Sequence, residues 1–312
     1  MKCINKRFVR VCSLLLVCSL CTISGTGCGE NRLEDAFEAD LPGIGIQTSE
    51  ESSKIPYFAS NLCVTDADVQ DIEADTEDAL AACFFNLDEK KVLYAKNIHE
   101  RMYPASTTKI MTALVALDKG DLDAQTTVSK EAITFSESGV STAKLKEGDV
   151  LTLRQLLYAL LTVSANDAAN VIAEQIAGSQ EAFVEMMNQE AQKIGATNTH
   201  FVNANGLHSE DHYTTVYDLY LMFNAAMQHE EFLQMLQEKE YQASYQAADG
   251  TTVEAVWSTT NQFTKGDVTV PDGVTAVGGK TGTTTAVINT VQMQHNVFQH
   301  GIRDQYCPVT LI

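Results

Sequence analysis

Ser106 and Lys109 are the first residues of this sequence whose types and spacing could perform chemistry. They lie three residues apart in the stretch PASTTKIMTALVAL, where an apolar run of helical character begins. Residues three apart share one face of a helix, so the lysine could act as a base toward the serine hydroxyl. The alternative is a capped helix without catalysis, because serine and threonine are preferred at helix N-termini. The pair alone leaves both interpretations open.

Two later stretches supply groups that could work with this pair. Ser164–Asn166 (SAN) falls in the break between two predicted helices, and Lys280–Gly282 (KTG) lies in a predicted strand. Each tripeptide alone is equally typical of an ordinary turn. The three stretches in this order, however, form the motif set of the penicillin-binding proteins and serine β-lactamases. The sequence resembles this class of serine enzymes, and the resemblance favours the catalytic interpretation of Ser106.

Longer stretches are similar to one branch of that class, the D-alanyl-D-alanine carboxypeptidases. These stretches are YPASTTKIMTALVAL, LLYALLTVSANDAANVIAE, TNTHFVNANGLHSEDHYTTVYDLYLM and GGKTGTT. The third stretch holds positions that recur in that family, namely Phe201, Asn203, Gly206, Leu207 and His212–Thr215. The resemblance covers residues 79–286, and it implies a serine hydrolase that removes the terminal D-alanine from peptidoglycan stem peptides.

The resemblance also implies a role for each catalytic motif residue. Ser106 would attack the penultimate carbonyl of a peptide that ends in D-Ala-D-Ala. Lys109 would take the serine proton, and it would be kept neutral by burial and by the positive charge of Lys280. Ser164 would relay a proton to the leaving D-alanine, and Asn166 would hold Lys109 and the substrate amide.

Binding of the substrate would rest on the late strand. In the family, backbone N–H groups equivalent to those of Ser106 and Thr283 stabilise the oxyanion. The terminal carboxylate would bind to Lys280, Thr281, Gly282 and Thr283. The expected partners are therefore stem peptides and β-lactam antibiotics, with no cofactor. We also expect no metal. His208 and His212 are four residues apart as in helical zinc motifs, but the glutamate stands at the third position instead of the second and Gly206 precedes the pair.

The elements that must position these residues follow from hydrophobic patterning. Strand-like runs occur at 79–87 and 91–97. Helices are expected at 106–118, 151–164, 166–178, 179–195 and 215–228, and later strands at 240–246, 251–259 and 274–284. Strands at both ends with helices between them predict an α+β fold, an antiparallel sheet flanked by helices with a helical lobe. The active site would lie between sheet and lobe.

The N-terminus has the features of an export signal. Positive residues precede Val11–Ile23, an apolar core too short to span a membrane, and Cys28 follows small residues as in lipoprotein signals. We expect a signal peptide or lipoprotein signal at 1–28 and an exported protein of the cell envelope, with a membrane anchor left open. Residues 29–80 carry 14 acidic and 2 basic residues, which predicts an acidic linker at 29–78. The net charge of −20 argues against nucleic acid as a partner.

The C-terminal residues 287–312 depart from the family pattern. They are rich in Asn, Gln and His and lack apolar alternation, so we expect little ordered β-structure, as a truncation or a shifted reading frame would produce. The departure leaves a catalytically impaired penicillin-binding envelope protein as the main alternative to a carboxypeptidase. A transpeptidase and a β-lactamase are further alternatives. The β-lactamase is disfavoured because no glutamate-bearing loop of the ExxLN type follows Asn166.

Overall fold

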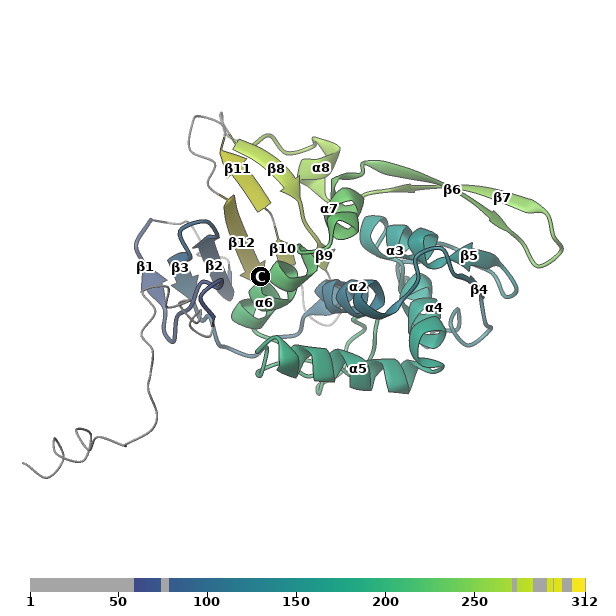
Figure 1. Cartoon of the computed structure of the whole chain (residues 1–312), viewed down its shortest axis with the longest axis horizontal. Helices are drawn as coiled ribbons and strands as arrows, with labels where there is room; N and C mark the ends of the chain where they lie inside the picture. Colours follow the sequence, from purple (N-terminus) through teal and green to yellow (C-terminus); the bar gives the residue numbers. More distant parts are fainter. Residues whose placement is uncertain are drawn as a thin grey trace, which may run out of the picture. The chain divides into compact units, whose positions relative to one another are not determined.

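An antiparallel sheet joins the first and last strands of the described chain (Figure 1). The computed structural model describes residues 59–73, 79–270 and 274–282, together with the backbone of the strands at 291–293, 295–298 and 305–311. The main path of the sheet is β1 (Val69–Gln70), β3 (Lys91–Lys96), β2 (Ala81–Asn86), β12 (Gln305–Leu311), β10 (Val291–Met293) and β9 (Thr281–Gly282). Beside β12, β11 (His295–Phe298) pairs with β8 (Val274–Gly278). The predicted α+β fold is confirmed.

Helices occupy the middle of the chain, as the sequence predicts. They are α2 (Thr108–Lys119), α3 (Leu153–Thr162), α4 (Asn166–Ala177), α5 (Gln180–Lys193), α6 (Val216–Ala226), α7 (Glu230–Gln237) and the short α8 (Gln262–Lys265). Local signals set several of their ends. Thr152 begins α3 through a capping box with Gln155, Ser179 caps α5, and Gly178 ends α4 in a left-handed conformation.

Helix α2 is the centre of the lobe. Every residue from Thr108 to Ala116 is buried, since α2 contacts α3, α4, α5 and α6. Helix α6 in turn packs on β2 and β12, so it connects the lobe to the main sheet. A short 3-10 turn, η1 (Ala105–Thr107), leads into α2 and contacts β9. This arrangement brings the start of the central helix to the edge strand of the sheet.

A second sheet differs from the expectation of a single one. The strands β6 (Glu240–Gln246) and β7 (Thr252–Ser258) form a long hairpin, which extends to one side in Figure 1. They pair with β4 (Gln125–Thr127) and β5 (Val150–Thr152) in a four-stranded sheet of their own. Strand character alone could not assign this hairpin to a sheet, because alternation fixes which face is buried but not which strand lies alongside.

Residues 59–73 belong to the fold, although the sequence placed them in the linker. Cys63 is fully buried and its backbone N–H donates to the hydroxyl of Tyr220 at 2.8 Å. Val69 and Gln70 form β1 and pair with Ala95 and Tyr94. The domain therefore begins before residue 79. The acidic composition of this segment concealed a few anchoring residues that pack on β3 and α6.

The C-terminal segment completes the main sheet, so the prediction of little β-structure after residue 286 is wrong. Strand β12 pairs with β2 over six residues, from Tyr306 opposite Asn86 to Leu311 opposite Ala81. It also pairs with β10 and β11. Alternation between polar and apolar residues reflects which faces of a sheet are buried, and it says nothing about whether a strand has backbone partners on both sides. The absence of alternation was therefore a weak criterion.

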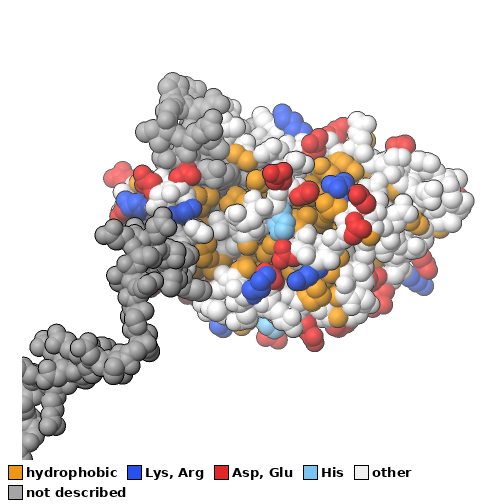
Figure 2. All heavy atoms as spheres, in the orientation of Figure 1, with side chains coloured by type: hydrophobic (Ala, Val, Ile, Leu, Met, Phe, Trp, Pro, Cys, Tyr) orange, Lys and Arg blue, Asp and Glu red, His pale blue; other side chains and the backbone are white. Residues whose placement is uncertain are grey.

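The proposed export signal at 1–28, with Cys28, and most of the linker lie outside the described residues. Among the helices of the described chain, none combines the length and the apolar character that a membrane crossing requires. On the face shown in Figure 2, lysine and arginine side chains lie among acidic ones and do not gather into a continuous basic surface.

Candidate active site

Ser106 lies at the junction between the main sheet and the lobe. It occupies η1, directly after Ala105, whose backbone has a positive φ of 50°. A non-glycine residue in this conformation is uncommon and marks a locally constrained backbone. Thr107 donates from its hydroxyl to the carbonyl of Pro104 at 2.6 Å, which closes the turn. The Ser106 side chain remains partly exposed while its neighbours are buried.

Lys109 is fully buried at the first turn of α2, directly behind the serine. Its Nζ lies 2.9 Å from Ser106 Oγ and 2.7 Å from Asn166 Oδ1, and it also contacts the backbone carbonyl of Asn205. Burial lowers the pKa of Lys109 well below its usual value, and the charge of Lys280 lowers this pKa further. The carboxylate of Asp167 acts in the opposite direction.

The three neighbours of the Lys109 amine are not equivalent. The Asn166 Oδ1 and Asn205 carbonyl oxygens can only accept hydrogen bonds, whereas the Ser106 hydroxyl can donate or accept. A neutral amine has two N–H groups and one lone pair. If the two N–H groups are given to the two acceptors, the lone pair faces the serine hydroxyl. This arrangement suits a neutral base that removes the Ser106 proton.

Ser164 lies between α3 and α4, in the predicted break between two helices, and Asn166 is the first residue of α4. Ser164 has a positive φ of 57°, a second constrained non-glycine residue at the site. The Nζ of Lys280 lies 2.9 Å from Ser164 Oγ and also donates to the carbonyl of Thr281. Lys280 is fully buried, and burial lowers its pKa to about 7. Each lysine therefore contacts a different serine: Lys109 of α2 contacts Ser106, and Lys280, directly before β9, contacts Ser164.

Strand β9 passes close to η1, the turn that contains Ser106. A Cβ at Gly282 would lie 2.9 Å from the backbone nitrogen of Ser106, so only glycine permits this approach. Thr281 places its hydroxyl 3.0 Å from that of Thr260, which follows β7. The predicted oxyanion and carboxylate residue Thr283 lies outside the described residues.

The segment 203–208 forms the other wall of the site, and sequence reasoning gave its residues no role. Gly206 has a φ of 85°, and a Cβ there would collide with the carbonyl of Ala105. Ala204 accepts a hydrogen bond from the Thr112 hydroxyl of α2 at 2.6 Å. The motif around Phe201–Leu207 was a usable signal for this wall. The carbonyl of Asn205 was not, because every residue has one.

His212 holds helix α2 in place through a hydrogen bond to Thr108. Its Nδ1 accepts from the backbone N–H of Val202 at 3.1 Å, so its Nε2 carries the proton and donates to Thr108 Oγ1 at 2.7 Å. Burial lowers the pKa of His212 to about 3. The neutral ring therefore links α2 to the segment that contains Val202. This link accounts for the place of His212 in the recurring motif.

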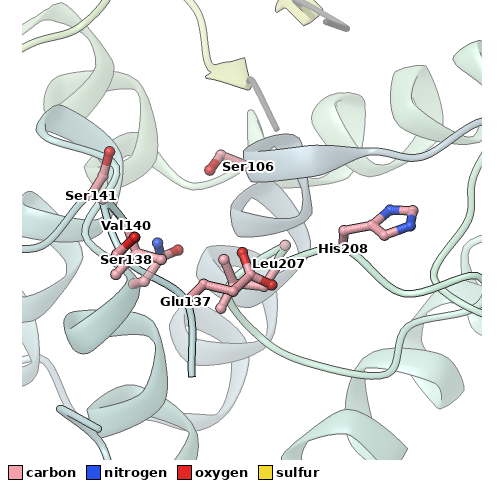
Figure 3. Close-up of a pocket in the computed structure, with 10 residues that line it drawn as sticks. Ser106, Glu137, Ser138, Val140, Ser141, Leu207 and His208 are labelled. Atoms are coloured by element: carbon pink, nitrogen blue, oxygen red, sulfur yellow. The ribbon is translucent and has the colours of Figure 1, made fainter. Parts of the chain in front are cut away.

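A pocket opens to solvent beside Ser106. Figure 3 shows side chains of the segment 137–141 on one side and of Leu207 and His208 on the other, with Ser106 between them. The buried Asp167 carboxylate holds the first of these segments from its C-terminal end, because it accepts from the backbone N–H groups of Ala143 and Leu145. The pocket is thus a cleft beside the serine with two fixed walls.

Comparison with known proteins gives the same assignment for most of the chain. The family described as D-alanyl-D-alanine carboxypeptidase matches residues 68–297. The chain is 40% identical over 156 residues to D-alanyl-D-alanine carboxypeptidase DacF of Bacillus subtilis, which covers 49% of this chain and 40% of that protein. It is 36% identical over 207 residues to DacB2 of Mycobacterium tuberculosis, which covers 66% of each. The chain thus spans less than two thirds of the length of these relatives.

Solved structures agree with this assignment. The crystal structure of the Streptomyces K15 DD-transpeptidase is similar with a TM-score of 0.67 and 28% identity, over 77% of this chain and 92% of that one. A penicillin-binding protein homolog from Mycobacterium tuberculosis is similar with a TM-score of 0.63 and 29% identity, over 79% and 86% of the two chains. Both similarities extend over most of the described domain.

Proposed function

The chain belongs to the D-alanyl-D-alanine carboxypeptidase family, and on that premise we propose that it removes the terminal D-alanine from peptidoglycan stem peptides through an acyl-enzyme on Ser106. The observation that carries the proposal is the fully buried Lys109, with a lowered pKa, at 2.9 Å from Ser106 Oγ. A free serine hydroxyl is a weak nucleophile and needs such a base.

Acylation would proceed in two steps. Ser106 Oγ attacks the penultimate carbonyl carbon and its proton passes to Lys109 Nζ, which gives a tetrahedral oxyanion. The oxyanion would accept from the backbone N–H of Ser106 and, as in the family, from that of Thr283. Collapse then breaks the C–N bond. Ser164 passes its proton to the leaving D-alanine and takes the proton held by Lys109, so Lys109 is neutral again in the acyl-enzyme. The contact between Lys280 and Ser164 supports this relay, since it holds the Ser164 hydroxyl within the site.

Deacylation would return the enzyme to its starting state. A water molecule gives a proton to Lys109 and attacks the ester carbonyl. As the ester bond breaks, Lys109 returns this proton to Ser106 Oγ, so the serine hydroxyl and the neutral amine are both restored. An amine in place of water would give transpeptidation. The similarity to the Streptomyces K15 DD-transpeptidase favours transfer as a second activity of the same acyl-enzyme. Release of D-alanine with and without an added amino-acid acceptor would separate the two reactions.

The proposed substrate lies outside the cytoplasm, so we place the activity in the cell envelope. The signal at 1–28, a lipid at Cys28 and a role in cell shape remain parts of this proposal. β-Lactams are proposed as ligands for the same reason as the peptide, because both present a carbonyl to the serine and a carboxylate to β9.

The first test concerns Ser106 itself. After incubation with a labelled penicillin, we expect a stoichiometric adduct on the tryptic peptide 102–109, localised to Ser106 by fragmentation. Ser106→Ala should give no adduct, while wild-type protein should also release D-alanine from a peptide ending in D-Ala-D-Ala. An adduct on Ser164, or none, would contradict the assignment. An adduct without release of D-alanine would instead favour the impaired penicillin-binding protein.

A second test concerns Lys280 as the carboxylate anchor. Lys280→Ala should lower kcat/KM for a peptide with a free C-terminal carboxylate about 10- to 100-fold more than for its C-terminal amide, because a charge-assisted hydrogen bond is lost only with the former. Loss of the contact with Ser164 should affect both substrates alike. Since burial lowers the pKa of Lys280 to about 7, the wild-type preference for the carboxylate should shrink as the pH rises above 7. Equal losses for both substrates would exclude the anchor role.

A further inference from the structure

Two buried asparagines, Asn170 and Asn205, link helix α4 to one wall of the site, and their side chains have no role in the mechanism above. Asn170 of α4 donates from Nδ2 to the carbonyl of Ala132 at 2.9 Å, and its Oδ1 accepts from Asn205 Nδ2 at 2.9 Å. Asn205 Oδ1 in turn accepts from the backbone N–H of Leu207 at 2.9 Å. The two residues are 4% and 5% exposed. They form a continuous chain of side-chain amides from Ala132, which precedes the wall segment 137–141, to Leu207 in the other wall.

The orientation of both amides follows from the two ends of this chain. At one end the backbone N–H of Leu207 can only donate, so it must face the oxygen of Asn205. At the other end the carbonyl of Ala132 can only accept, so it must face the nitrogen of Asn170. The central contact then joins the remaining nitrogen of Asn205 to the remaining oxygen of Asn170. One arrangement alone satisfies all three hydrogen bonds.

The residue at the middle of this chain is also the one that contacts the base. The backbone carbonyl of Asn205 accepts from Lys109 Nζ, while the Asn205 side chain is held by Asn170 and Leu207. A residue fixed at both polar ends of its side chain has little freedom to move its backbone. The position of the carbonyl relative to Lys109 therefore depends on the amide chain.

We propose that Asn170 is a positioning residue which, through Asn205, holds the Asn205 carbonyl against the Lys109 amine and so directs the lone pair of that amine toward Ser106. This inference rests on the proposed function. If the carbonyl moves away, one amine N–H loses its acceptor and can turn toward Ser106 Oγ. The lone pair then points elsewhere, and the base is present but misdirected.

The expected signature combines two opposite changes. Loss of an acceptor carbonyl destabilises the charged ammonium, so the pKa of Lys109 should fall further. Acylation by penicillin should therefore reach half of its maximal rate constant at a lower pH. At the same time the maximal rate constant should fall about tenfold, as expected when one positioning hydrogen bond is lost. A variant that is merely less stable would lower the amplitude of acylation without moving the midpoint.

The experiment measures single-turnover acylation by penicillin against pH for Asn170→Ala, Asn205→Ala and the double variant. Amplitude reports the folded fraction and the rate constant reports positioning, so partial unfolding does not obscure the result. The double variant should lose no more than either single one, since all three break the same chain. If Asn170→Ala yields no folded protein, the rate constant and the midpoint are measured on Asn205→Ala instead.

Asn188→Ala is the matched control. The side-chain amide of Asn188 also holds the chain near the site. It accepts from the backbone N–H of Phe201 and donates to the carbonyl of Phe201, which lies upstream of Asn205. The substitution should lower stability and leave the acylation midpoint unchanged. If Asn170→Ala behaves like this control, the positioning role is wrong, although the proposed function stands. If the wild-type protein itself is not acylated, the proposed function fails instead.

Discussion

Replacing Lys109 with methionine is expected to abolish acylation of Ser106, by penicillin and by peptide alike. Methionine has a similar length and apolar stem but cannot take a proton. General bases contribute about 10²–10⁴-fold to reactions of this kind, so the rate constant for acylation should fall by at least about a hundredfold. The effect should be in the chemical step, because Lys109 contacts Ser106 Oγ and is not expected to touch the substrate carboxylate.

The pH dependence of the wild-type protein gives the same test without a mutation. The base must be neutral, so acylation by a C-terminal amide substrate, which does not depend on the charge of Lys280, should rise with pH through the pKa of Lys109 and then level off. Burial and the charge of Lys280 both lower that pKa, so the plateau should begin well below the range in which an exposed lysine titrates. In Lys109→Met this rise should be absent.

A control separates chemistry from folding. Lys109→Met leaves the oxygens of Asn166 and Asn205 without their donor, which costs about 1–3 kcal/mol for each buried group. Thermal unfolding should therefore be measured beside acylation, with Lys119→Met at the other end of α2 as the comparison. Lys119 is the last residue of that helix and lies far along it from the serine. A Lys109→Met protein that is folded and acylates within tenfold of the wild-type rate would rule out the base.

That the candidate catalytic residues lie together was predictable, because side-chain chemistry and spacing single them out. Ser106 and Lys109 share a helical turn, and Lys280 reaches Ser164 as the order of the motifs implies. The Asn205 carbonyl, in contrast, acts through its backbone, which has no sequence signature. Asn170 was hidden for a different reason, because one asparagine in a helix is usually a surface residue. Only the packing of α4 against the segment 203–208 gives it a role.

The sheet shows the corresponding limit for the fold. Strands β2 and β3 and the central helix were predictable from local patterning. On the side away from β3, the neighbour of β2 in the sheet is β12, which lies about 220 residues later in the chain. Pairing over such a separation depends on the whole fold. Proline disfavours a central strand, yet Pro308 pairs with Phe84. It lies between the residues of β12 that pair with β11 and those that pair with β10. A missing N–H is tolerated at such a break.

Removal of residues 291–312 should therefore unfold the domain. The deletion takes β10, β11 and β12 from the main sheet and leaves the backbone groups of β2, β8 and β9 without these partners. Strand β9 would lose its pairing with β10, in which Thr281 and Gly282 lie opposite Gln292 and Val291. We expect no cooperative thermal unfolding and no acylation by penicillin in the shortened protein. A cooperative transition within a few degrees of wild type would show that these strands are dispensable.

A single substitution tests the same pairing at full chain length. Thr310 lies opposite Ala82 of β2 and Gln292 of β10, so a proline there meets neighbours on both sides, unlike Pro308. Thr310→Pro removes a ladder hydrogen bond and should cost about 3 kcal/mol or more, by analogy with the loss caused by proline inside a helix. For a domain of this size, that loss corresponds to a melting temperature lower by about 6–12 °C. Thr310→Val keeps the N–H and a β-branched side chain, so it should melt close to wild type.

If both variants melt alike, β12 is not held between β2 and β10. If only the proline variant melts early and is acylated more slowly, the late strands both stabilise the sheet and support the strand that carries Thr281.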